Sequence, residues 1–365
     1  MKIKIGDITK IRTGKLDANA ADENGQYPFF TCSKNPLKIN TYSYDCECVL
    51  VAGNGDLNVK YYNGKFDAYQ RTYIIEDNSN GLLFMPYLYF FMESYMDELR
   101  KQSIGGVIKY IKLKNLTDAF IELPSIEVQR KIVNIISKAK EIVRRKENEF
   151  ELLDELVKAR FVEMFGDLRV NDKGWKYYKL DELTELITDG EHATPKRTTQ
   201  GIYLLSARNV LNHQLSLEDV DYIDYDEFSR ISRRIIPREG DVLISCSGSI
   251  GRCCVVPKNI KFQMVRSIAL LRFKSNINPV FAEYMITSDY LQDQINKSKT
   301  ASSQANLFQG KIKSLKGVVP PLELQNQFAS FVQEIDKSRL LNICLKSLVE
   351  SVLKIRIFSE YKKSS

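Results

Sequence analysis

Two stretches decide how this chain is organised: LPSIEVQRKIVNIISKAKEI (Leu123–Ile142) and VPPLELQNQFASFVQEIDKS (Val319–Ser338). They align without a gap at an offset of 196 residues, and matches continue downstream, where Leu152 coincides with Leu348 and Arg160 with Arg356. The coinciding positions include Pro124 with Pro320, Glu127 with Glu323, Gln129 with Gln325, Ile132 with Phe328, and Ile136 with Val332. Few identities within a shared apolar register indicate a duplicated helix.

Both copies carry the signals of long amphipathic helices. A proline precedes each one, and a glutamate lies in its first turn, where the helix dipole favours a negative charge. No Gly or Pro interrupts Ser125–Phe165 or Leu322–Lys363. We therefore predict two helices of about 36–40 residues, roughly 55–60 Å long at 1.5 Å per residue. In the first copy one apolar row follows residues 132, 135, 139, 142, 153 and 156, and a second, at heptad spacing, follows 136, 143, 150, 157 and 164.

Such long helices with wide apolar stripes predict that the two copies pack on each other as an antiparallel coiled coil. The alternative is that each helix lies on its own domain. Arg339, Asn342 and Lys346 of the second copy align with Val143, Lys146 and Phe150, so the middle of that helix is more polar than its ends. This polar stretch is either a packing defect or a docking surface.

A globular module precedes each helix. CECVLVAGNGD (Cys46–Asp56) and GDVLISCSGSIG (Gly240–Gly251) each combine a β-branched run with a glycine-rich turn. Each is followed by a further strand and then by a helix, predicted at Met85–Gln102 and Pro279–Ile295. The fold class is α+β, a pseudo-twofold repeat of two mixed α/β modules and two helices. The predicted segments are modules at 1–123 and 171–319, and helices at 124–166 and 320–363.

Composition excludes several classes of protein. The chain has 365 residues, 44% of them hydrophobic and 27% charged, as in ordinary globular protein. Seven cysteines and two histidines form no zinc-site spacing and are expected to be reduced thiols of a cytoplasmic protein. No signal peptide or membrane span is expected. The net charge of +7 mildly favours an acidic partner such as nucleic acid.

Catalytic motifs are missing from the sequence. It contains no N-P-P-[FY] signature of an amino-methyltransferase, no P-loop and no G-x-S-x-G elbow. Gly53-Asn54-Gly55 resembles a phosphate cradle, but a strand follows it, which favours a strand turn. The single histidine in TDGEHATPKR (Thr188–Arg197) is more typical of a polar loop than of a general base. The chain is therefore predicted not to be an enzyme.

Basic, amide and aromatic residues between the predicted strands form the positive signal. Lys and Arg neutralise phosphates, while Arg, Lys, Asn and Gln read base edges through paired hydrogen bonds. The candidate DNA-binding residues of the first module are Arg12, Lys15, Lys34, Asn54, Lys60, Tyr61, Gln70, Arg71 and Lys109. Those of the second module are His192, Lys196, Arg197, Arg208, Asn209, Ser247, Arg252 and Arg266.

The motifs resemble one known family. Val319–Ser338 is similar to the helix-entry motif of the specificity subunits of type I restriction–modification systems, and Leu123–Ile142 is similar to their central conserved region. YPFFTCS (Tyr27–Ser33), followed by Val49–Ile75, resembles one kind of target-recognition domain in that family. TDGEHATPKR and LLSARNV (Leu204–Val210) resemble the opening of another kind.

The resemblance implies a function that composition alone does not give. Each module would be a target-recognition domain that reads one half of a bipartite double-stranded DNA site. The helices would space the halves and dock two methyltransferase subunits, which hold S-adenosylmethionine and methylate adenine at N6. A motor–nuclease subunit would cut unmodified DNA, and this chain would bind no cofactor or metal itself. The alternatives are a coiled-coil adaptor that bridges proteins without reading DNA, and a standalone DNA-modifying enzyme, which the missing motifs argue against.

Overall fold

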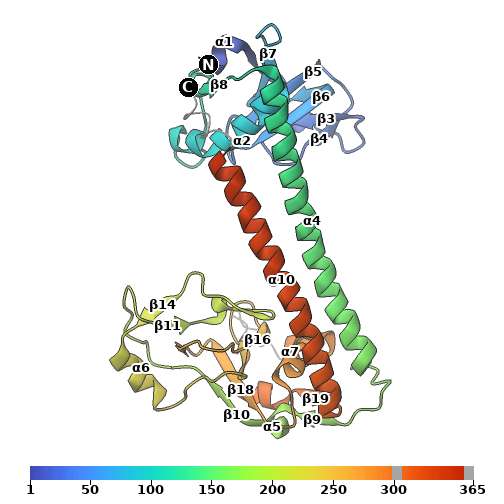
Figure 1. The fold of residues 1–365 in the computed structure, drawn as a ribbon, viewed down its shortest axis with the longest axis vertical. Coiled ribbons are helices and arrows are strands. Elements are labelled where there is room, and N and C mark those ends of the chain that lie inside the picture. The colour runs from blue at the N-terminus through green and yellow to red at the C-terminus, as the bar shows by residue number, and fades with distance from the viewer. Residues whose placement is uncertain (298–305, 357–365) are drawn as a thin grey trace. The chain divides into compact units, whose positions relative to one another are not determined.

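The computed structural model describes residues 1–297 and 306–356, with the backbone alone at 341 and 344–356 (Figure 1). The chain forms two compact units: Met1–Glu147 together with the chain from Ile343 on, and Asn148–Asn342. The two predicted long helices are confirmed as α4 (Ile126–Phe165) and α10 (Leu322–Arg356). The predicted continuation of the second helix to residue 363 lies outside the described residues, and the segment boundaries stay a prediction.

A six-stranded sheet is the centre of the first unit (Figure 1). Its strands pair antiparallel, except that β3 and β6 run parallel. In sheet order they are β2 (Thr9–Thr13), β7 (Thr72–Asp77), β5 (Tyr44–Ala52), β6 (Val59–Ala68), β3 (Tyr27–Phe30) and β4 (Leu37–Ile39). On β5, Val49 and Val51 face the core shared with helix α2 (Met85–Gln102), while Cys48 and Leu50 face a second core. Both faces of the central strand are therefore buried.

The second unit holds two smaller sheets. The four-stranded sheet has the order β10 (Thr184–Asp189), β18 (Ile268–Phe273), β15 (Val242–Ser245) and β16 (Cys253–Val255). The three-stranded sheet has the order β14 (Asp221–Ile223), β11 (Ile202–Leu205) and β17 (Phe262–Met264). Helix α6 (Tyr225–Ser232) packs against the smaller sheet through Phe228 and Ile231.

Each module is closed by a pair of short strands. In the first, β1 (Lys2–Lys4) pairs with β8 (Phe120–Glu122), directly before α4. In the second, β9 (Tyr177–Lys179) pairs with β19 (Lys316–Val318), directly before α10. The start of each module thus lies beside its end. The short elements left are α1 (Ile5–Ile8), η1 (Ala18–Ala20), α3 (Leu113–Thr117), α5 (Leu180–Leu183), η2 (Ala207–Asn209), β12 (Val210–Leu211), β13 (Gln214–Leu215) and α9 (Gln309–Ser314).

One predicted helix is divided in two. Instead of a single helix over Pro279–Ile295, the chain forms α7 (Pro279–Thr287) and α8 (Asp289–Lys297). Ser288 between them has extended backbone angles, and its hydroxyl donates to the Met285 carbonyl at 2.6 Å. A serine side chain that bonds the backbone in this way competes with the helical hydrogen bond and ends the helix.

Within the second unit, the end of α4 lies beside the start of α10. The contacts join Phe165 to Phe328, with ring centroids 5.6 Å apart, Arg160 to Phe331, Asp154 to Arg339, and Glu149 to Asn342 at 3.0 Å. Residue numbers fall along α4 as they rise along α10, so the helices run antiparallel over this stretch. Arg339 and the buried Asn342 form polar contacts between the helices here.

Burial separates the two apolar rows predicted for α4. The heptad row is covered: Ile136 and Val157 are buried, and Val143, Phe150 and Met164 are half-buried. The other row is mixed: Ile132 is buried and Ala139 and Leu153 are half-buried, whereas Ile135, Ile142 and Leu156 are about half exposed, at 58%, 47% and 48%. The predicted wide stripe is therefore covered mainly along its heptad component.

Candidate nucleic-acid interface

A tight turn between β6 and β7, Tyr69–Thr72, forms the centre of the candidate interface in the first module. The turn is tied to three other segments of the module by backbone hydrogen bonds. Tyr69 N donates to Phe30 O at 2.9 Å, Gln70 N to Leu16 O at 2.9 Å, Thr72 N to Tyr69 O at 2.8 Å, and Gly53 N to Arg71 O at 2.8 Å. The backbone of this turn is therefore fixed by the fold.

The second module builds the same turn between β17 and β18, at Val265–Ile268. Val265 N donates to Leu205 O at 3.0 Å, Arg266 N to Glu191 O at 3.0 Å, Ile268 N to Val265 O at 3.0 Å, and Cys246 N to Ser267 O at 2.8 Å. Each bond has its counterpart in the first module. Gln70 thus corresponds to Arg266, and Arg71 corresponds to Ser267.

The equivalence extends to the segments around both turns, and we call each turn together with these segments the turn frame. In the first module the turn frame comprises Tyr69–Thr72, Gly14–Leu16, Gly53–Asn54 and Tyr110–Ile111. In the second module it comprises Val265–Ile268, Gly190–Glu191, Cys246–Ser247 and Asn306–Leu307. In the first module Gly14 N donates to Thr72 O at 3.0 Å, and Ile111 N donates to Gly53 O at 2.9 Å. Their counterparts in the second module are Gly190 N to Ile268 O at 3.0 Å and Leu307 N to Cys246 O at 2.9 Å. A β-bridge joins Asn54 to Tyr110, and another joins Ser247 to Asn306. Glycine is required at the equivalent positions Gly14 and Gly190, because a Cβ there would lie 2.1 Å from Ala68 O or 2.3 Å from Met264 O.

Five of the predicted residues of the first module come together around its turn frame: Lys15, Asn54, Gln70, Arg71 and Lys109. All but the half-buried Asn54 are exposed. Lys109 belongs to the loop that pairs with Gly53–Gly55, since Gly55 N donates to Lys109 O at 2.9 Å. Lys34 is exposed two residues after Cys32, whose thiol lies 3.6 Å from Arg71 O.

Three other predicted residues of this module have partners within the fold. Arg12 pairs with Glu76 at 2.6 Å and lies over the Tyr44 ring. The hydroxyl of Tyr61 donates to Glu47 at 2.6 Å. Lys60 donates to Asn58, and burial lowers the pKa of its ammonium group. Their polar groups are therefore less free to reach DNA than those of the turn frame.

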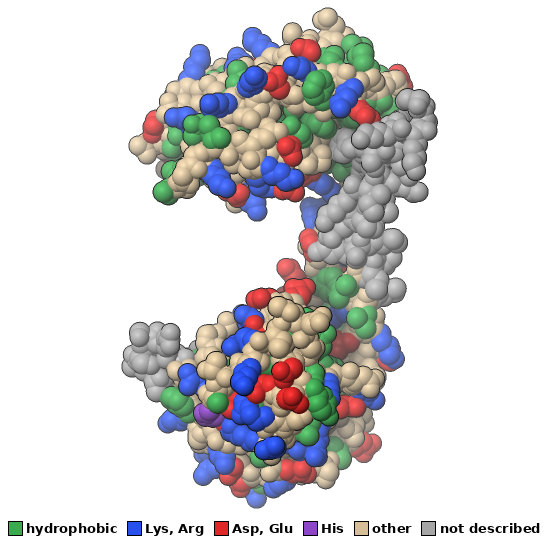
Figure 2. Space-filling model, turned by 90° about the vertical axis from the view of Figure 1, so that its left-hand side faces the viewer, with side chains coloured by type: hydrophobic (Ala, Val, Ile, Leu, Met, Phe, Trp, Pro, Cys, Tyr) green, Lys and Arg blue, Asp and Glu red, His purple; other side chains and the backbone are tan. Residues whose placement is uncertain are grey.

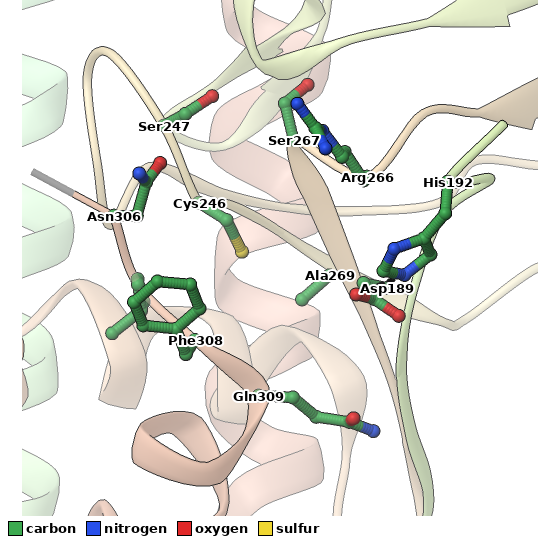
Figure 3. A pocket seen from close by; sticks show the side chains of 11 residues that line it. Asp189, His192, Cys246, Ser247, Arg266, Ser267, Ala269, Asn306, Phe308 and Gln309 are labelled. Atoms are coloured by element: carbon green, nitrogen blue, oxygen red, sulfur yellow. Dashed lines mark hydrogen bonds and ion pairs between the residues drawn. The ribbon is translucent and has the colours of Figure 1, made fainter. Parts of the chain in front are cut away.

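In the second module the turn frame borders a hollow of about 530 Å³. Three predicted residues line it: His192, Ser247 and Arg266 (Figure 3). The imidazole Nε2 of His192 lies 2.8 Å from Asp189 Oδ2, and Arg234 donates to Asp189 Oδ1 at 2.6 Å. Cys246 forms part of the floor, where burial raises the pKa of its thiol to about 12. The hollow thus presents hydroxyl, imidazole and guanidinium groups over an inert thiol.

The remaining predicted residues of this module lie outside its turn frame. Arg197 and Arg208 both pair with Asp221, at 3.1 and 3.4 Å. Asn209 is only 1% exposed. Its side-chain oxygen accepts from Ser206 N and its side-chain nitrogen donates to two backbone carbonyls, so its amide group is already hydrogen-bonded within the module. Lys196 is exposed, and its backbone N–H donates to Glu227. Arg252 is half-buried, and its backbone N–H donates to Ser245 Oγ.

Sequence reasoning missed Asp189 and Arg234 as parts of the site. Asp189 directly precedes the Gly190–His192 run, a position from which a carboxylate can orient the imidazole. Arg234 gave no such signal, because it lies 45 residues away from Asp189 in the chain. Only the tertiary structure brings its guanidinium to Asp189, Thr188 and the Gly190 carbonyl.

Charge by itself does not single out a binding face. In the view of Figure 2, Lys and Arg side chains lie among acidic ones on both units. Within the described residues, no group of His, Cys, Asp and Glu has the arrangement of a metal site. No described helix is long and apolar enough to cross a membrane. The turn frame, which both modules share, is therefore the feature on which the candidate interface is based.

Comparisons with known proteins agree with this architecture. The chain is 44% identical over 123 residues to the EcoDI specificity subunit of Escherichia coli, a match that spans 34% of this chain and 27% of that subunit. It is 21% identical over 368 residues to the MjaVIII specificity subunit of Methanocaldococcus jannaschii, covering 92% of this chain and 85% of the relative.

Solved structures show the same fold at low sequence identity. The type I restriction–modification S subunit of M. genitalium matches with a TM-score of 0.62 at 14% identity, covering 99% of this chain and 96% of that one. A chain from a structure described as complex assembly and conformational transition of the type I R-M system matches with a TM-score of 0.58, at the same identity and coverage. The family model of the type I restriction modification DNA specificity domain matches residues 1–152 and 172–350. The chain therefore belongs to the family of type I restriction–modification specificity subunits.

Proposed function

We propose that this chain reads a bipartite DNA target for a type I restriction–modification complex, with one half-site read by each module. One observation carries the proposal: the turn frame is built twice with equivalent backbone hydrogen bonds, while its exposed side chains differ between the copies. A constant backbone with variable side chains is what two readers of different half-sites require. Phosphate contacts position such readers, and base contacts give them specificity.

The two long helices act as the spacer between the readers. We propose that they pair antiparallel as a coiled coil with pseudo-twofold symmetry, as the contacts between α4 and α10 in the second unit support. A helix of roughly 55 Å spans about 16 base pairs. The unread gap is shorter, because each module overlaps the end of a helix. Two linked readers gain avidity, since the second binding event becomes intramolecular.

The chemistry belongs to partner subunits in this proposal. Two methyltransferase subunits hold S-adenosylmethionine and methylate adenine at N6, and a motor–nuclease subunit cleaves unmodified DNA in the cytoplasm. This chain is non-catalytic and binds no cofactor. Membership of the specificity-subunit family supports the assignment, as does the similarity to a chain whose structure is described in terms of complex assembly of a type I R-M system.

Domain exchange combined with methylation mapping tests this function. Methylation-aware sequencing of a host that expresses the complete system should show one asymmetric, interrupted motif. Replacing residues 1–123 with another recognition domain should change one half of that motif and leave the other intact. A change in both halves contradicts the modular assignment. DNA binding by the purified assembly that is absent or insensitive to salt contradicts DNA reading and favours a protein-bridging adaptor.

A further inference from the structure

The side chain at the tip of each turn frame is free to meet DNA. Gln70 and Arg266 occupy equivalent positions, and both are exposed. The backbone N–H of each donates across the module, to Leu16 O and Glu191 O, both of which hold the turn in place. In the described part of the chain, neither the Gln70 amide nor the Arg266 guanidinium has a hydrogen-bond or ion-pair partner. The fold thus fixes the backbone and leaves the side chain available.

The neighbouring position does not have this property in both modules. Arg71 is exposed, but its counterpart Ser267 is half-buried and accepts a hydrogen bond from Ala207 N at 3.0 Å. Most other arginines of the second module are committed to carboxylates, as Arg234 is to Asp189 and Arg272 to Asp241. Of the two central positions of the turn, the tip, Gln70 or Arg266, is therefore the one at which both modules present an exposed polar side chain without a hydrogen-bond partner among the described residues.

Glutamine and arginine share one chemical property that matters for DNA. Each ends in a planar group that forms two hydrogen bonds to one base edge in the major groove: Gln pairs with adenine N6 and N7, and Arg with guanine O6 and N7. The Gln70 amide can donate to a phosphate oxygen, but it supplies no charge, so neutralising a phosphate is not a role that the two side chains share. Reading a base edge through two hydrogen bonds is a role that both planar groups can perform.

We propose that the tip of the turn frame is a base-reading position in both modules, where Gln70 recognises an adenine of one half-site and Arg266 recognises a guanine of the other. The inference rests on the proposed function and adds the residues and the base class. Around Arg266, the hollow lined by Ser247 and His192 leaves room for a base edge. Asp189 accepts a hydrogen bond from Arg234 and lies 2.8 Å from His192 Nε2, which orients the imidazole ring. Figure 3 shows Asp189 and His192 next to each other in the lining of the hollow.

The test is selection from a pool of duplexes with a randomised stretch. The full chain, co-purified with the methyltransferase subunits of its own system, is used as wild type, as Arg266→Gln and as Gln70→Arg. We expect Arg266→Gln to convert one guanine preference to adenine in one half-site, and Gln70→Arg to make the reverse change in the other. Each bidentate contact should discriminate about 5- to 150-fold against the wrong base.

Matched variants control for charge and exposure. Lys258→Gln removes one positive charge from an exposed side chain of the second module, as Arg266→Gln does. Gln26→Arg adds one positive charge to the first module, as Gln70→Arg does, at an exposed residue directly before β3. Both should leave the selected motif unchanged. Arg266→Ala and Gln70→Ala should lose the preference at one position each, while melting curves verify that the variants fold.

Different results would contradict the proposed function and the base-reading role of the tip. If the wild type enriches no sequence, the proposed function is wrong. If the wild type selects a motif but folded Arg266→Gln keeps it unchanged, or weakens every position equally, the tip does not read a base and the inference is overturned. A base change in both half-sites from a single substitution also overturns it.

Discussion

Gln129 and Gln325, 196 residues apart in the sequence, make the same three hydrogen bonds. The side-chain oxygen of each accepts the backbone N–H at the start of a helix, Phe84 N or Asn278 N, at 2.8 Å. The side-chain nitrogen donates to two carbonyls, those of Leu82 and Pro124 in one case and of Asn276 and Pro320 in the other. Both glutamines are fully buried. Each clamps a module to the first turn of its long helix.

Replacing this clamp should destabilise the protein. Gln325→Ala leaves the Asn278 N–H and two carbonyls without this partner, and each buried polar group left unpaired costs about 1–3 kcal/mol. Urea denaturation followed by circular dichroism measures the loss. Gln327→Ala, two residues away on the exposed face of α10, should change stability by no more than about 0.5 kcal/mol. Equal effects of the two variants would show that the clamp contributes little.

Lengthening both spacer helices should lengthen the unread gap of the DNA motif. Seven residues inserted in the middle of α4 and of α10 preserve the heptad row and add about 10 Å, or about 3 base pairs. Methylation mapping gives the new gap. The same insertion in α4 alone shifts the helices out of register and should reduce methylation. A gap that stays constant in the double insertion contradicts the role of the helices as a ruler.

The cross-helix pair of Arg339 and Asp154 should couple weakly. The Asp154 side chain is 63% exposed, so a double-mutant cycle with Arg339→Gln and Asp154→Asn should give a coupling of about 0.3–1 kcal/mol that falls with added salt. Thermal or urea unfolding supplies the four stabilities. Pairing Arg339→Gln with Glu155→Gln, on the next residue of α4, should show no coupling. A coupling as large for Glu155 would place the helices in a different register.

Buried Glu283 predicts that stability falls as the pH rises. Burial raises the pKa of this carboxyl above its ordinary value of 4.5, and His213, 3.5 Å away, opposes the shift. The folded state therefore holds the proton more tightly than the unfolded chain, so the contribution to stability is present below the ordinary pKa and is lost as the pH rises through the folded pKa.

The variant Glu283→Gln cannot ionise, and its amide oxygen can still accept the Val255 N–H. The wild type should lose stability relative to this variant as the pH rises above the ordinary carboxyl pKa of 4.5 and through the raised pKa of the folded state. Denaturant midpoints at several pH values measure the difference. A difference that is constant, or that changes in the opposite direction, would contradict a raised pKa at this carboxyl.

The buried cysteines should resist alkylation in the folded protein. Burial raises the pKa of Cys48, Cys253 and Cys254, and that of Cys246 to about 12, so little reactive thiolate forms at neutral pH. Peptide mass spectrometry after iodoacetamide treatment should find label first at the partly exposed Cys32. In urea all of these thiols should react. Rapid labelling of Cys246 in the native state would show that the floor of the hollow is open.

The sequence by itself determined the duplicated helix and the two-module order, because apolar spacing and the prolines before each helix are local signals. It also pointed to Gln70, Arg71 and Arg266 as candidate DNA-binding residues. It did not pair Gln70 with Arg266, since that equivalence depends on hydrogen bonds between segments far apart in the chain. One runs from Tyr69 N to Phe30 O, 39 residues away, and its counterpart runs from Val265 N to Leu205 O, 60 residues away. Tertiary structure alone decided which polar side chains are hydrogen-bonded within the protein, as Asn209 is, and which remain exposed without a partner at the tip of the turn frame.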